Sequence, residues 1–89
     1  MTKWRIELLA DDPLMIYDDI SDNYDGVEVL YLHSNDQKAF ENAALIPFDE
    51  IKLISGRTIE RRGYVNAKRI DCVQETEDEY KHPPITFSG

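Results

Sequence analysis

Apolar and polar residues alternate at the start of the chain. In residues 3 to 9, Trp4, Ile6 and Leu8 fall on one side and charged residues on the other, which is the period of a half-buried β-strand. Residues 27 to 33 also alternate, but apolar side chains occupy both of their faces, with Val27, Val29 and Tyr31 on one and Leu30 and Leu32 on the other. A strand of this kind lies inside a sheet that is covered from two sides.

The segment between these strands has two interpretations. Asp12 followed by Pro13 matches a helix N-cap and its first-turn proline, so residues 13 to 20 form either a short helix or a buried strand. Periodicity does not separate the two in so short an apolar run. Residues 21 to 26 end in Asp-Gly and are rich in Asx side chains, which is typical of a turn.

Residues 35 to 45 are expected to form one short helix that covers the sheet. Ser34 begins a capping-box pattern, Phe40 would face the sheet, and Pro47 would end the helix. The alternative is a return strand over residues 43 to 46, which would make the domain wholly β.

The second half of the chain predicts further strands. Residues 48 to 51 are expected to form a tight turn that leads into a short strand over residues 52 to 55. Residues 58 to 65 and 68 to 74 are expected to form an antiparallel hairpin about Asn66 and Ala67. We therefore expect an α+β fold: a small single domain with a mostly antiparallel, partly closed sheet of four or five strands and one short helix. A small all-β barrel is the alternative.

One globular domain is expected over residues 1 to 75, and residues 76 to 89 form an acidic, proline-containing C-terminal tail that is partly ordered or disordered. The core is expected to contain the large apolar residues of the predicted strands and helix: Trp4, Ile6, Leu8, Val29, Leu30, Leu32, Phe40, Leu45, Ile51, Leu53, Ile70 and Val73.

Composition supports an ordered domain. Of the 89 residues, 42% are apolar, which is too many for an intrinsically disordered segment of the same charge. No apolar run approaches the roughly 18 residues needed to cross a bilayer, and the N-terminus does not resemble a signal peptide, so we expect a cytoplasmic protein with no membrane partner. The single cysteine, Cys72, excludes an internal disulfide.

Charge divides the chain into three bands. Residues 1 to 50 carry twelve acidic and three basic side chains, residues 51 to 70 carry one acidic and six basic, and residues 71 to 89 carry five acidic and one basic, for a net charge of −8. Segregation of this kind bears on partners and solubility rather than on the fold.

The first acidic band predicts a surface that binds a protein partner. Its carboxylates and the neighbouring aromatic residues form the expected site: Asp11, Asp12, Asp18, Asp19, Asp22, Asp25, Tyr17 and Tyr24, with Ile20 as a further apolar anchor. The function expected is that of a small, acidic, non-enzymatic interaction protein, of the kind found among bacterial and bacteriophage accessory proteins. A nucleic-acid-mimicking inhibitor is one alternative for the same surface.

The basic band predicts another alternative, a nucleic-acid-binding module that uses the hairpin over residues 57 to 69. Its cations would contact phosphates and its tyrosine would stack on a base: Arg57, Arg61, Arg62, Tyr64, Lys68 and Arg69. The competing interpretation is that these cations pair with acidic neighbours and only keep the surface soluble. The negative charge elsewhere favours the second interpretation, because it repels phosphates.

Catalytic, cofactor and metal signals are weak. His33, His82 and Cys72 lack the spacing of a zinc site. A calcium loop in which Gly26 is the invariant glycine fails because Leu32 stands where a bidentate glutamate is required. No glycine-rich phosphate loop and no nucleophile with a supporting base is apparent. We therefore expect no enzyme, no cofactor and no metal, and leave self-association open.

Overall fold

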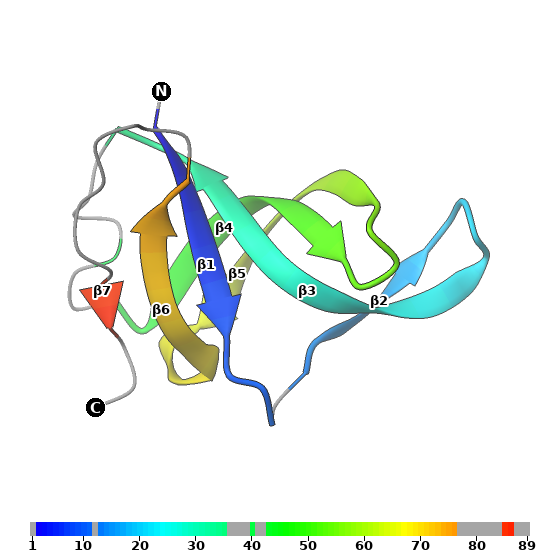
Figure 1. Cartoon of the computed structure of the whole chain (residues 1–89), viewed down its shortest axis with the longest axis horizontal. Helices are drawn as coiled ribbons and strands as arrows, with labels where there is room; N and C mark the ends of the chain where they lie inside the picture. Colours follow the sequence, from blue (N-terminus) through cyan, green and yellow to red (C-terminus); the bar gives the residue numbers. More distant parts are fainter. Residues whose placement is uncertain (1, 12, 36–39, 41–42, 77–84, 87–89) are drawn as a thin grey trace.

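Seven strands and one short helical turn make up the computed structural model, which describes all residues except 1, 12, 36–39, 41–42, 77–84 and 87–89 (Figure 1). The strands are β1 (Lys3–Leu8), β2 (Met15–Asp18), β3 (Asn23–His33), β4 (Leu45–Leu53), β5 (Thr58–Asn66), β6 (Ile70–Glu75) and β7 (Ile85–Thr86), and the turn is the 3-10 helix η2 (Ala67–Arg69). The described part contains no helix that is long and apolar enough to cross a membrane.

All strand pairs are antiparallel. Six strands are hydrogen-bonded side by side in the order β5-β4-β3-β1-β6-β7. The remaining strand, β2, pairs only with the first part of β3. The prediction of a small, antiparallel, single-sheet domain is confirmed, although the sheet has more strands than the four or five expected. The sheet is not closed, since no described residue of β5 pairs with β6 or β7.

The connection from β5 to β6 requires the sheet to curl. β5 ends at Asn66 and β6 begins at Ile70, so the chain between them spans at most ~14 Å. In a flat sheet, β4, β3 and β1 would lie between these two strands and hold them ~19 Å apart. The sheet must therefore bend strongly. Figure 1 shows that β5 and β6, which are separated in the sheet by three strands, are turned toward each other.

A bulge in β3 bends the sheet and divides its side chains between two faces. Val27 pairs with Leu53 and Val29 with Lys52, so Glu28 is an extra residue in β3. A bulge of this kind changes which side chains share a face. Val27 consequently lies in the core with Leu30 and Leu32 instead of on the face of Val29, which corrects the predicted alternation.

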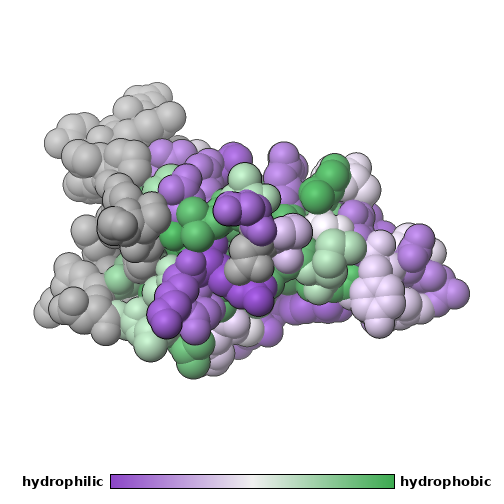
Figure 2. Space-filling model, turned by 90° about the horizontal axis from the view of Figure 1, so that it is seen from below, coloured by the Kyte–Doolittle hydropathy of each residue, from purple (hydrophilic) through white to green (hydrophobic). Residues whose placement is uncertain are grey.

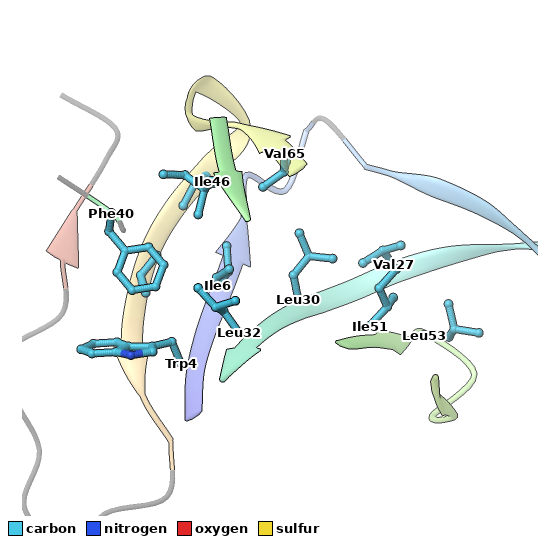
Figure 3. Close-up of a cluster of buried hydrophobic side chains, with 12 residues drawn as sticks. Trp4, Ile6, Val27, Leu30, Leu32, Phe40, Ile46, Ile51, Leu53 and Val65 are labelled. Carbon is cyan, nitrogen blue, oxygen red and sulfur yellow. The ribbon is translucent and has the colours of Figure 1, made fainter. Parts of the chain in front are cut away.

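The core lies inside the curl of the sheet (Figure 3). Trp4 and Phe40 pack edge to face at one end, with ring centroids 5.2 Å apart, and Leu53 and Val27 lie at the other. Ten of the expected core residues are buried: Trp4, Ile6, Val29, Leu30, Leu32, Phe40, Ile51, Leu53, Ile70 and Val73. Val29 faces away from the inner cluster, and Leu8 packs against that cluster while partly exposed.

Leu45 is the wrong core prediction, because it is 55% exposed. It begins β4 and pairs with Asn66, whereas Ile46 pairs with Val65, and both Ile46 and Val65 are buried. Successive side chains of a strand point to opposite faces, so a shift of one residue exchanges the buried and exposed positions.

The predicted α+β class is not what the described residues show, because β-strands dominate them. Of the helix predicted over residues 35 to 45, residues 36–39 and 41–42 lie outside the described part, and Leu45 belongs to β4. The segment 13 to 20 contains strand β2, so its helical interpretation is wrong. The turn predicted over 21 to 26 is also wrong in its bounds, since residues from Asn23 onward pair with β2.

The predicted hairpin over residues 58 to 74 is wrong as well. β5 pairs with β4, and β6 pairs with β1. The side chain of Asn66 accepts a hydrogen bond from Lys68 N at 2.9 Å, and Ala67 N donates to Ala44 O at 2.9 Å. These bonds hold the chain in η2 and direct it away from β5. Beyond β6, β7 lies within the predicted tail and pairs with Cys72 and Val73.

Candidate functional site

The hairpin of β2 and the first part of β3 projects from the body of the sheet (Figure 1). Met15 pairs with Gly26 and Tyr17 with Tyr24, so their side chains lie on one face. The two tyrosine rings meet edge to face, with centroids 5.4 Å apart. This contact is a favourable geometry for an aromatic pair.

Two further exposed apolar side chains, Ile54 and Ile20, belong to turns next to this face. Ile54, in the turn between β4 and β5, donates its backbone N–H to Gly26 O at 3.0 Å, and its side chain occupies the space that a Cβ on Gly26 would need. Ile20 lies at the tip of the hairpin. We call these five residues the hairpin surface: Met15, Tyr17, Ile20, Tyr24 and Ile54, which are 40 to 81% exposed.

The opposite face of the hairpin is anchored to the domain. Ile16 and Leu14 pack against the core cluster. Asp18 is buried, forms an ion pair with Arg57, and accepts a hydrogen bond from Ile20 N at 3.0 Å. The hairpin surface is thus presented by a strand pair that is fixed from behind.

The environment of Asp18 favours its charged form. Burial by itself raises the pKa of the Asp18 carboxyl, but the hydrogen bonds from Arg57 and Ile20 N and the Arg57 charge outweigh that effect and lower the pKa below its usual value. Asp18 therefore carries a negative charge that is directed to Arg57 and not to solvent.

The other acidic residues of the predicted site lie at separate places on and around the hairpin. Asp19 and Asp22 are exposed at the tip, and Asp22 accepts a hydrogen bond from the Tyr17 hydroxyl. Asp25 pairs with Ile16 on the face away from Tyr24. Asp11 is exposed before the hairpin, whereas Asp12 lies outside the described part. In Figure 2, the projecting end of the molecule shows pale and green surface next to hydrophilic purple surface.

The predicted basic residues do not form one face. Arg57 is paired with Asp18 across 39 positions of the sequence. Arg62 and Tyr64 point outward from β5, and Arg61 is half-buried on the same strand. Lys68 and Arg69 lie on η2.

The described part also contains a shallow hollow of about 320 Å³ at the end of β3. His33 Nδ1 lies 2.9 Å from Asp49 Oδ1, and His33 N donates to Asp49 Oδ2 at 3.0 Å. The residues that line it are Leu32, His33, Pro47, Phe48, Asp49, Arg62, Gly63 and Tyr64. None of these lining residues is a serine, threonine or cysteine that His33 could activate as a nucleophile. The two hydrogen bonds between His33 and Asp49 tie the end of β3 to β4.

Cys72 lies on the outer face of the sheet, where it and two carboxylates gather. Its Sγ donates to Glu7 Oε2 at 3.4 Å, and Asp71 is within 4.8 Å of this pair. Burial, followed by the hydrogen bond and the negative charge of Glu7, raises the pKa of the Cys72 thiol to about 11. The thiol consequently stays protonated at neutral pH, the form that is poor both as a nucleophile and as a metal ligand.

Replacing Glu7 with glutamine is expected to make Cys72 more reactive. The uncharged amide no longer opposes ionisation of the thiol, so a larger thiolate fraction is present at a given pH. The measurement is the rate of alkylation by iodoacetamide as a function of pH. In the wild type the rate should keep rising until pH is about 11, and in the variant the curve should shift to lower pH. An unchanged curve would show that Glu7 does not control the thiol.

Sequence reasoning found Tyr17, Ile20 and Tyr24 but missed Met15 and Ile54. Met15 was part of a segment with two interpretations, and only the strand interpretation places it beside Tyr17. Ile54 reaches the hairpin through a contact of the turn between β4 and β5 with Gly26 of β3, for which the sequence carries no signal. Comparison of the chain with known proteins finds no matching family model, no matching curated protein and no matching solved structure.

Proposed function

We propose that this chain is a non-enzymatic, cytoplasmic interaction protein that binds a protein partner through the hairpin surface. The observation that carries the proposal is the exposure of five large apolar side chains, four on the projecting hairpin and Ile54 on the adjacent turn between β4 and β5. Single exposed apolar residues are ordinary, but a contiguous group of them indicates a site of interaction. Tyrosine is also enriched among the residues that dominate binding energy at interfaces.

The anchoring of the hairpin supports this function. A loop that becomes ordered only on binding loses conformational entropy, and that loss weakens the complex. Here the ion pair of Asp18 with Arg57 and the packing of Ile16 fix the hairpin in the free protein. A partner would meet a surface that is already in its binding conformation.

Charge indicates the chemistry of the partner. Asp19 and Asp22 flank the apolar group at the tip, Arg57 is neutralised by Asp18, and the chain as a whole carries a net charge of −8. The complementary surface is an apolar cleft with lysine or arginine at its rim. Such a partner would associate faster at low salt, because the opposite charges attract each other at long range.

The test is a selection of binding peptides from a random displayed library with the wild-type protein as bait, followed by affinity measurements on variants. Tyr24→Ser should weaken the selected peptides at least ten-fold, which is ~1.4 kcal/mol. The selected peptides should combine apolar residues with lysine or arginine.

Tyr64→Ser is the matched control, since Tyr64 is a tyrosine on β5 with 71% exposure, close to the 67% of Tyr24. It should leave the affinity unchanged. Loss of binding in Tyr64→Ser with full binding in Tyr24→Ser would refute the proposal and direct attention to β5. Selection of acidic peptides would refute the proposed partner chemistry.

A further inference from the structure

The strand β2 has a free edge. It pairs with the first part of β3 on one side, and no described strand pairs with it on the other. The backbone N–H and C=O groups along a free edge of this kind are a template for another strand. The hydrogen bonds around the hairpin determine which residues of β2 direct these groups outward.

Met15 and Tyr17 direct their backbone groups to this free edge. Val27 N donates to Leu14 O at 2.9 Å across the start of the hairpin. In an antiparallel pair, positions that bond to the partner strand alternate with positions that do not. Ile16, two residues after Leu14, therefore bonds to β3 again. The backbone groups of Met15 and Tyr17, on either side of Ile16, point the other way.

Gly26, which lies opposite Met15 in the hairpin, follows the same alternation. Its C=O is turned away from β2 and accepts a hydrogen bond from Ile54 N at 3.0 Å, in the turn after β4. The side chains of Met15 and Tyr17 belong to the hairpin surface and are 59% and 40% exposed. The same two residues therefore offer a partner both outward backbone groups and apolar contacts.

Acidic side chains around β2 determine which kind of strand fits this edge. Asp19 and Asp22 are exposed at the tip of the hairpin, and Asp11 is exposed before β2. Asp25 lies opposite Ile16 and has no ion-pair partner among the described residues. An antiparallel second copy of β2 would bring Asp19 of each chain toward Asp11 of the other, and these charges repel. A segment with lysine or arginine is attracted instead.

We propose that the partner binds as an extended segment that adds antiparallel to the free edge of β2, with apolar and basic side chains in alternation. This inference rests on the proposed function, because it uses the same hairpin surface. Residues of the segment opposite Met15 and Tyr17 lie on the face of that surface and are apolar. The residue opposite Ile16 lies on the face of Asp25 and is lysine or arginine. In strand addition, backbone bonds supply affinity and alternate side chains supply specificity.

The test uses the tightest-binding peptide from the library selection, synthesised with one N-methyl group at each position in turn. In the antiparallel arrangement, the N–H groups of the residues opposite Met15 and Tyr17 face β2. N-methylation of these apolar residues removes a hydrogen bond and should weaken binding at least ten-fold. N-methylation of the basic residues, whose N–H groups face solvent, is the matched control and should leave the affinity unchanged.

Equal losses at the two sets of positions, or losses at the basic residues alone, would overturn the proposal. Selected peptides in which apolar and basic residues do not alternate would overturn it too. A peptide that tolerates every N-methyl group but binds Tyr24→Ser more weakly than the wild type would overturn strand addition and leave the proposed function standing. Peptides that all bind Tyr24→Ser as tightly as the wild type would overturn the proposed function, and this inference with it.

Discussion

Replacing Leu30 with alanine is expected to lower the free energy of unfolding by about 3 kcal/mol. Leu30 is fully buried in the middle of β3 and lies near the centre of the inner cluster (Figure 3). The substitution removes apolar contacts and leaves a cavity that the curled sheet fills only in part. Small domains are stable by about 5 to 15 kcal/mol, so this loss is a large share of the total. Urea denaturation followed by the fluorescence of the single tryptophan, Trp4, measures it.

Leu45→Ala is the matched control for that experiment. It makes the same change in side-chain size, but Leu45 is 55% exposed at the start of β4, and surface substitutions usually change stability by less than about 0.5 kcal/mol. Similar losses in the two variants, or a larger loss in Leu45→Ala, would contradict the arrangement of β4 in which Ile46 and not Leu45 points inward.

Asp18→Asn is expected to release the hairpin from the domain. The amide has the size of the carboxyl and can still accept a hydrogen bond from Ile20 N, but it carries no charge to hold Arg57. Removal of one member of a buried ion pair leaves the other without its partner. Amide hydrogen exchange should therefore accelerate in β2 and in the part of β3 that pairs with it, while β1 and β6 keep their protection.

The pH dependence of the same variant provides a second readout. The pKa of Asp18 is lower in the folded protein than its ordinary value of 3.8, so the ion pair contributes fully above that value and is lost as pH falls through the lower folded pKa. Asp18→Asn should remove this part of the acid sensitivity. Asp19→Asn is the control because Asp19 is exposed beside it. Equal effects of the two substitutions, or unchanged exchange in Asp18→Asn, would show that the ion pair does not fix the hairpin.

The sequence predicted local features of the fold well. β1 was recognisable because Trp4, Ile6 and Leu8 alternate with charged residues. β3 was recognisable because residues 27 to 33 are apolar on both faces of the strand. The bulge at Glu28 was not predictable, since it depends on how β3 is matched to β4. The separation of β5 from β6 was missed for a similar reason: two strands joined by a short turn normally pair, and only the hydrogen bonds of η2 show why these do not.

The charge bands of the sequence do not remain separate in the structure. Asp18 of the acidic band pairs with Arg57 of the basic band, and Lys52 lies 3.5 Å from Glu28. Contacts between residues so far apart in the chain are set by the fold and leave no local signal in the sequence. The case for a docking surface therefore rests on the exposed apolar face of the hairpin, with Asp19 and Asp22 as its remaining exposed charges.

The most direct test of the central claim is amide hydrogen exchange of the wild-type protein with and without a saturating selected peptide. If the hairpin surface is the docking site, exchange should slow in residues 15 to 25 and at Ile54, and remain unchanged in β5. Slower exchange in β5 or around His33 and Asp49, with the hairpin unaffected, would contradict the claim.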